Sequence, residues 1–121
     1  MAISNVNGKW GETIAAEFLR KKHYAVIGCN YRCKFGEIDL IVQNRKFLVF
    51  VEVKLRKTDR YGQAREFVTA SKQQKIRTTA MLWLQSHPNY RQPRFDVVEI
   101  YAPDGVYTSE PEIIHLEDAF S

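Results

Sequence analysis

Carboxylate and ammonium side chains are concentrated between Gly36 and Lys54, in two stretches that are otherwise apolar. Residues 36–41 read Gly-Glu-Ile-Asp-Leu-Ile, and residues 49–54 read Val-Phe-Val-Glu-Val-Lys. Carboxylate oxygens are ligands that suit Mg²⁺ or Mn²⁺, and such a cation can activate water for phosphodiester hydrolysis. The chemistry that these residues could support is therefore metal-assisted hydrolysis, with an ammonium group to orient the water or to balance phosphate charge.

The two stretches predict neighbouring β-strands that form a hairpin. Ile38–Val42 and Phe47–Val53 are rich in β-branched and aromatic residues, and the polar segment Gln43–Lys46 supplies the Asn that hairpin turns favour. The second strand is apolar enough to lie at the centre of a sheet. Glu and Lys are rarely buried there without a partner, so its two charged residues need an explanation.

The register of this hairpin decides which charged groups meet. A turn centred between residues 44 and 45 places Asp39 opposite Phe50 and Glu37 opposite Glu52. Because side chains alternate between faces, Glu37, Asp39, Glu52 and Lys54 then share one face. Carboxylates gathered in this way repel one another unless a proton or a cation lies between them, so the pattern predicts a metal site.

The rest of the chain predicts a sheet flanked by two helices. Apolar residues at four-residue spacing indicate a helix that begins after Asn7 or Gly8 and ends near Lys22, and a second helix runs from about Thr69 to Ser86. Further strands are predicted at residues 24–31, 95–101, 106–108 and 113–116. The order α-β-β-β-α-β, with a short β tail, is an α/β (α+β) arrangement with a mixed sheet, in a single domain of residues 1–121.

Both helices carry polar residues that could reach the sheet. Glu12 shares a flank of the first helix with small apolar residues, which could bring it close to the carboxylates. A solvated acid that complements the helix dipole is the alternative. The core stripe of the second helix, extended back by one turn, reaches Lys72 and Gln73, although residues in a first turn are often solvated.

Positive charge is unevenly distributed. The net charge is +4, but Lys54–Arg77 contains eight basic and two acidic residues. A positive field beside a metal site suits a polyanion such as a nucleic acid. The residues expected to contact it are Arg32, Arg56, Lys57, Arg60, Arg65, Lys72 and Lys75.

Several other classes of protein fit poorly. Residues 1–9 lack the apolar region of a signal peptide, and no run approaches the length of a membrane span, so we expect a cytoplasmic protein with no membrane partner. The spacing of Cys29 and Cys33 matches neither a zinc knuckle nor a redox motif, and we expect both to be reduced. The three histidines are scattered, which argues against zinc.

The two motifs resemble those of the PD-(D/E)xK nuclease superfamily. More closely, the sequence resembles the YraN-like family of uncharacterised bacterial proteins, which has the restriction-endonuclease-like fold. The resemblance covers nearly the whole chain. Beyond the two motifs it includes Gly11-Glu12, Asn30-Tyr31-Arg32, Arg56, Gly62, Lys72 and Arg94-Phe95-Asp96-Val97-Val98.

This resemblance implies roles for individual residues. Asp39 and Glu52 correspond to metal ligands, the backbone carbonyl of Val53 to a third ligand, and Lys54 to the residue at the attacking water. Glu12 corresponds to the helical acid that many members add. Lys72 or Gln73 corresponds to the polar residue of the second helix. Apart from the resemblance, the hairpin register places Glu37 nearby as a weaker candidate ligand. No Pro precedes Asp39, where the superfamily name expects one, but Pro supplies only local geometry.

Two functions follow from these observations. The first is a Mg²⁺-dependent (or Mn²⁺-dependent) endonuclease that hydrolyses phosphodiester bonds of DNA, with branched or junction DNA as a candidate substrate. The alternative is a non-catalytic nucleic-acid-binding module that retains the nuclease fold. DNA is favoured over RNA, and a homodimer is expected from the fold because cutting two strands usually takes two sites.

Overall fold

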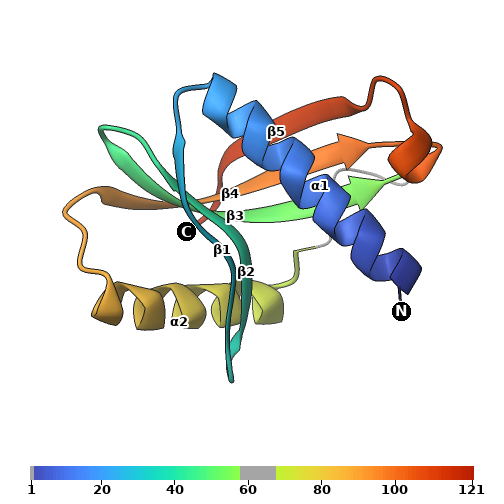
Figure 1. Ribbon diagram of the computed structural model, residues 1–121. Coiled ribbons are helices and arrows are strands. Elements are labelled where there is room, and N and C mark those ends of the chain that lie inside the picture. The colour runs from blue at the N-terminus through green and yellow to red at the C-terminus, as the bar shows by residue number, and fades with distance from the viewer. Residues whose placement is uncertain (1, 58–67) are drawn as a thin grey trace.

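The computed structural model describes residues 2–57 and 68–121, with side chains from Gly8 onward. Its helices and strands follow in the order α1 (Ala2–Lys21), β1 (Ala25–Cys33), β2 (Gly36–Gln43), β3 (Phe47–Arg56), α2 (Ala70–Ser86), β4 (Gln92–Tyr101), the short 3₁₀ helix η2 (Gly105–Tyr107) and β5 (Glu112–Phe120). One five-stranded mixed sheet is flanked by the two helices (Figure 1). The αβββαβ core predicted from the sequence is therefore confirmed.

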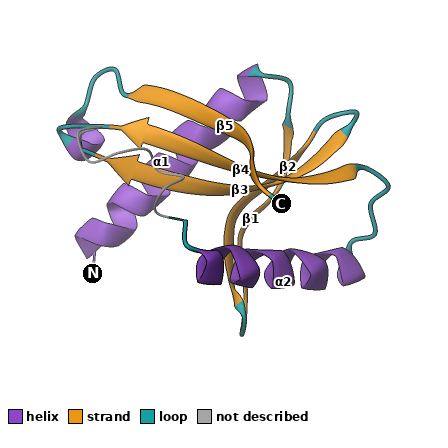
Figure 2. Ribbon diagram, turned by 180° about the vertical axis from the view of Figure 1, so that it is seen from behind, coloured by secondary structure: helices purple, strands orange, loops and turns teal. Residues whose placement is uncertain are grey.

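The sheet has its strands in sequence order, from β1 at one edge to β5 at the other. Neighbouring strands are antiparallel except β3 and β4, which are parallel. A parallel pair needs a long crossover connection, and α2 belongs to that connection. Figure 2 shows α2 below the sheet, with the free end of the β1–β2 hairpin passing beside it.

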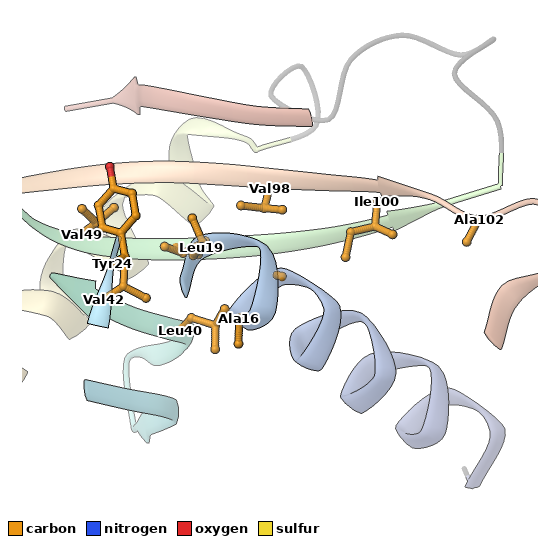
Figure 3. Close-up of a cluster of buried hydrophobic side chains, with 11 residues drawn as sticks. Ala16, Leu19, Tyr24, Leu40, Val42, Val49, Val98, Ile100 and Ala102 are labelled. Carbon is orange, nitrogen blue, oxygen red and sulfur yellow. The ribbon is translucent and has the colours of Figure 1, made fainter. Parts of the chain in front are cut away.

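Each helix packs on its own face of the sheet. The α1 face contains Leu19 of the helix and Val49 of β3, both labelled in Figure 3. Val51 of β3 belongs to the same cluster. The α2 face contains Leu48 and Phe50 of the same strand. Because β3 is buried on both faces, it is the central strand, as its apolar sequence predicts. No helix in the described part of the chain is long and apolar enough to cross a membrane.

The hairpin register differs from the predicted one by two residues. Ile41 pairs with Phe50, and the turn is closed by the N–H of Asn44 donating to the carbonyl of Phe47 at 3.1 Å. The Asn44 side chain fixes this position, since its Oδ1 accepts the N–H groups of Lys46 at 3.0 Å and Phe47 at 2.8 Å. A shift of two residues exchanges neighbours but keeps every side chain on its predicted face.

Three elements also differ from prediction. Helix α1 begins at Ala2, and Gly8 lies inside it. A single Gly costs a helix only about 1 kcal/mol, so Gly8 does not mark the helix start. The predicted strand at 106–108 is instead the 3₁₀ turn η2, which begins at Gly105 with a φ of 59°. Strand β5 is longer than predicted and runs antiparallel to β4.

A buried ionic network joins β4 to β5 on the α1 face. Arg94 donates from Nε and Nη2 to the two carboxylate oxygens of Asp96 at 2.9 and 2.8 Å. Asp96 also lies 2.6 Å from His115 Nε2 and accepts the N–H of Asp118 at 3.0 Å. Arg94 donates further to the hydroxyl of Tyr24 at 2.6 Å. Asp96 therefore has a structural role, because it pairs with Arg94 on β4 and accepts hydrogen bonds from β5.

We expect Asp96→Asn to lower the free energy of unfolding by about 3–5 kcal/mol, because it leaves the buried Arg94 guanidinium without its counterion. Burial alone would raise the pKa of Asp96, but hydrogen bonds from His115 and Arg94 outweigh it and lower the pKa. The stabilisation is therefore present above about pH 4 and is lost as pH falls through the lowered pKa. Urea unfolding at several pH values checks this. Asp104→Asn, at an exposed turn, is the matched control and should change stability little.

Candidate active site

The site begins where strand β2 leaves strand β3. The ladder between these strands ends at the pair Leu40–Val51, before it reaches Asp39. The Asp39 carboxylate replaces the missing backbone partner, and its Oδ2 accepts the N–H of Val53 at 2.8 Å. The N–H and C=O of one residue point to the same side of a strand, so the Val53 carbonyl also faces this gap. Asp39 and the Val53 carbonyl, both expected as metal ligands, therefore meet here.

Glu52 is the buried partner of Asp39. Its side chain is on the α2 face of β3, and the residue is only 8% exposed. Together with burial, the negative charge of Glu52 acts on the Asp39 carboxyl group and raises its pKa. Glu52 Oε2 also lies 3.4 Å from Lys54 Nζ and 2.5 Å from Lys72 Nζ. The structure thus brings together the three residues of the two sequence motifs and adds Lys72 from the first turn of α2, while their roles stay predictions.

A cleft on the other side of Asp39 brings in Glu12 and Glu37. The cleft has a volume of about 310 Å³. Glu12 accepts a hydrogen bond from Asn30 Nδ2 at 2.9 Å, and Glu37 accepts one from Arg32 Nε at 3.1 Å. The residues that line the cleft are Gly8, Lys9, Glu12, Asn30, Arg32, Glu37 and Asp39. Glu12 is therefore at the site rather than a distant solvated acid, and Glu37 is near it.

The electrostatics of the site reflect crowded carboxylates. Burial, together with the negative charges of Glu52 and Glu12, raises the pKa of Asp39 to about 7 although Val53 donates to it. Burial lowers the pKa of Lys54, and the adjacent Lys72 reinforces the effect. Burial also acts to lower the pKa of Lys72, but the hydrogen bond and charge of Glu52 outweigh it and raise the pKa. A proton or ammonium thus neutralises charge in the metal-free protein.

Gln73 differs from its neighbour Lys72. Its Nε2 donates to the carbonyl of Val68 at 2.9 Å, which ties the first turn of α2 to the segment before it. Consecutive helix residues point about 100° apart, so only one of the two can face Glu52 directly. Of the two alternatives for the second helix, Lys72 is the one that contacts the carboxylates.

The basic residues expected to contact nucleic acid differ in their exposure to solvent. Arg56 is half-buried at the end of β3, and its carbonyl accepts the N–H of Ala102 at 2.7 Å. Arg60 and Arg65 lie outside the described residues. The other basic residues outside the carboxylate cluster are exposed, namely Arg32, Lys57 and Lys75.

Two residues were missed by the sequence analysis. Glu99 is fully buried, is in register with Lys54 on the parallel strand β4, and accepts a hydrogen bond from the Tyr101 hydroxyl at 2.8 Å. The sequence could have identified Glu99, because it is an acid within the apolar run 97–101. The same kind of pattern identified Glu52. Asn30, the partner of Glu12, has a φ of 52°, which Asn tolerates better than most residues. No sequence pattern pointed to that pairing.

The donor atoms at this site fit a hard divalent cation. Asp39, Glu52 and the Val53 carbonyl offer oxygen atoms at one gap in the sheet. Across residues 2–57 and 68–121, no three His, Cys, Asp or Glu side chains converge into a complete metal-binding group. Mg²⁺ does not require one, since it usually keeps several waters and binds one or two carboxylates plus substrate phosphates. The residues present therefore suit Mg²⁺ or Mn²⁺ with water or phosphate completing the coordination.

The αβββαβ core, with acids and lysines at the end of the β2–β3 ladder, defines a protein of the restriction-endonuclease-like fold class. The chain belongs to the uncharacterised protein family UPF0102, whose family model matches residues 11–100. A UPF0102 protein of Renibacterium salmoninarum is 41% identical over 90% of this chain and 91% of its own length. One from Geotalea daltonii is 44% identical over 93% of this chain and 87% of its own length. A third, from Acinetobacter baumannii, is 45% identical over 81% and 75%.

We expect Asp39→Asn to stabilise the metal-free protein at pH 8. A carboxyl group whose pKa is raised on folding favours the folded state at low pH, and this advantage is lost as pH rises through about 7. The gain from Asp39→Asn should therefore be largest above pH 7 and vanish near pH 4. Each pKa unit corresponds to about 1.4 kcal/mol, so the gain is on the order of 4 kcal/mol at most.

Urea unfolding in EDTA across this pH range measures the gain. Asn can still accept the N–H of Val53, so the substitution removes charge with little change in shape. Glu112→Gln, on exposed β5, is a charge-matched control that should show no such pH dependence. A variant that is less stable than the wild type at pH 8 would mean that the nearby lysines outweigh the repulsion between the acids.

Proposed function

We propose that this protein is a divalent-metal-dependent endonuclease that acts on DNA, with branched or junction DNA as a candidate substrate. The observation that carries the proposal is the meeting of the two motifs at Val53, whose N–H donates to Asp39 Oδ2 at 2.8 Å while Oε2 of the preceding residue, Glu52, lies 3.4 Å from Lys54 Nζ. Two adjacent carboxylates in a sheet interior are costly for folding, and a hard cation relieves that cost. The cluster is therefore better explained by chemistry than by stability.

Each residue of the site would have a separate role in hydrolysis. Mg²⁺ or Mn²⁺, when bound, would polarise a phosphate oxygen and lower the pKa of a bound water. Asp39, Glu52 and the Val53 carbonyl would hold the cation. Lys54 follows Glu52 by two residues on the same face, where it can orient the attacking water, and its lowered pKa suits proton transfer. Glu12 approaches from α1 and can hold a further water through its carboxylate.

Exposed basic side chains around the carboxylates suit a nucleic-acid backbone. Arg32 lines the cleft beside Asp39, and Lys57 follows the end of β3. Side chains of this kind bind phosphates without regard to base identity. Cutting both strands of a duplex or a junction would take two such sites, which is the basis for expecting a homodimer.

The second candidate function is a nucleic-acid-binding module without catalysis. The observation in its favour is that Lys72 and Lys54 already neutralise Glu52 in the metal-free protein, as in a structural ion pair. That reading does not account for Asp39, a second acid that accepts the N–H of Val53, the residue next to Glu52. Metal-dependent cleavage separates the two functions.

We expect the wild type to cleave DNA with Mg²⁺ or Mn²⁺ but not in EDTA, and Glu52→Gln to reduce the cleavage rate by about 100-fold or more. Loss of a metal ligand removes several kcal/mol of transition-state stabilisation, and each 1.4 kcal/mol is about tenfold in rate. Linear, single-stranded and four-way-junction DNA are the substrates to compare. Binding measured on the same DNA shows whether the variant still recognises it.

Glu112→Gln supplies the control, since it makes the same chemical change at an exposed position on β5. Circular dichroism of each variant establishes that the fold is retained. Wild-type protein that binds DNA but cuts none of the substrates with either metal would favour the non-catalytic module. Loss of folding in Glu52→Gln, with a wild type indifferent to metal, would make Glu52 a structural ion-pair partner.

We expect DNA affinity to fall with salt and the double substitution Arg32→Ala, Lys57→Ala to flatten that dependence. Each phosphate contact contributes about −0.9 to the slope of log K against log salt on duplex DNA, so losing two contacts should change the slope by about 1.8. Arg45→Ala, Lys46→Ala removes the same charges at the exposed β2–β3 turn and is the matched control. Fluorescence anisotropy at several salt concentrations provides the measurement. Equal slopes for the two double variants would remove the support for this interface.

A further inference from the structure

Glu52 is shared by two ammonium groups through one oxygen atom. Lys72 Nζ lies 2.5 Å and Lys54 Nζ 3.4 Å from Glu52 Oε2. The carboxylate is nearly buried, so these lysines, rather than solvent, neutralise it. The position that a cation would need beside Glu52 is therefore already under the influence of two positive charges.

A divalent cation and both ammonium groups cannot remain together at this carboxylate. Like charges a few ångströms apart repel strongly where water is excluded, and the repulsion doubles when one partner is divalent. We propose that Lys72 is an internal counterion of Glu52 that is exchanged for the metal, and that the released ammonium binds a phosphate of the nucleic acid. This inference rests on the proposed metal-dependent function of the same site.

Lys72 is better placed to leave than Lys54. The Lys54 side chain is 21% exposed and extends from the central strand two residues after Glu52. The Lys72 side chain is 41% exposed and reaches the carboxylate from the first turn of α2. A cation at a helix N-terminus is also disfavoured by the helix dipole, which weakens its hold there without Glu52. The flexible stem of lysine lets the ammonium swing towards solvent while the helix stays in place.

The exchange couples two ligands. In the absence of nucleic acid the metal must separate an ion pair, so the wild type should bind metal weakly. A phosphate at the site gives the released Lys72 a new partner and also supplies oxygen ligands to the metal. Metal and nucleic acid should therefore strengthen each other's binding, by equal factors as linkage requires.

The test measures Mn²⁺ affinity rather than cleavage. The wild-type chain, Lys72→Met and Lys46→Met are titrated with Mn²⁺ by calorimetry, first alone and then with a short phosphorothioate DNA duplex that resists cleavage. Lys46 is exposed at the β2–β3 turn, so Lys46→Met matches the change in net charge without touching Glu52. Asp39→Asn identifies the part of the binding that belongs to this site.

Without DNA, we expect Lys72→Met to bind Mn²⁺ roughly 5- to 100-fold more tightly than the wild type, the usual range for coupled sites, and Lys46→Met to match the wild type within about twofold. DNA should tighten Mn²⁺ binding more for the wild type than for Lys72→Met. Equal Mn²⁺ affinities of the wild type and Lys72→Met, both sensitive to Asp39→Asn, would overturn the exchange while leaving the metal site in place.

Absence of any Mn²⁺ binding that Asp39→Asn removes, in every variant and with or without DNA, would instead overturn the proposed metal-dependent function itself. If Lys72→Met does not fold, Lys72→Gln carries the same expectation, because its amide can still donate a hydrogen bond to Glu52 without the charge. These outcomes separate a wrong account of Lys72 from a wrong account of the site.

Discussion

The hydrogen bond from the backbone of Val53 to the Asp39 carboxylate is the constraint on which the site depends. It occurs where the β2–β3 ladder stops, so a side chain takes the place that a backbone carbonyl occupies in a continuous sheet. That substitution satisfies a half-buried N–H group and at the same time opens a gap in the sheet. Glu52 and Lys72 reach the gap from one face, and Glu12 reaches it from the other.

Two aspartates of this chain have opposite electrostatic environments. Asp96 is surrounded by donors, with Arg94, His115 and the backbone of Asp118 turned towards it. Asp39 has one backbone donor and acidic neighbours. The first environment favours the charged form and holds β4 and β5 together, whereas the second opposes it. Departures of this kind from local electrostatic consistency are expected where a protein binds or reacts.

The sequence predicted which face of the sheet each side chain occupies better than it predicted which residues pair across neighbouring strands. Alternation alone put Glu52 and Lys54 on one side of β3, and a two-residue error in the turn left that result unchanged because the side-chain period is two. The error came from Asn44, which was expected at the centre of the turn. Its side chain instead accepts the N–H groups of Lys46 and Phe47, so the turn is centred one residue later. The start of α1 was misplaced for a similar reason, since Gly8 was read as a local signal although the surrounding helix overrides it.

Sequence patterns could not predict which side chains meet when their helices or strands are distant in the chain. Whether Lys72 or Gln73 meets Glu52 depends on the rotation of α2 about its axis, which its packing on the sheet decides. The same holds for Asn30, whose pairing with Glu12 needs the twist of β1 relative to α1. Glu99 was within reach of pattern reading, because it interrupts an apolar strand as Glu52 does.

The parallel pairing of β3 with β4 has a consequence for how the chain folds. Asp39 and Glu52 belong to a local hairpin, which can form within microseconds, whereas the β3–β4 pair must wait for the crossover that contains α2. Until α2 docks, the hairpin carries its acids without Lys72. Attraction between Lys72 and the acids of the hairpin therefore favours the docking of α2. Added salt screens these charges and should slow that step. In this fold the docking of α2 completes both the tertiary structure and the charged cluster around Glu52.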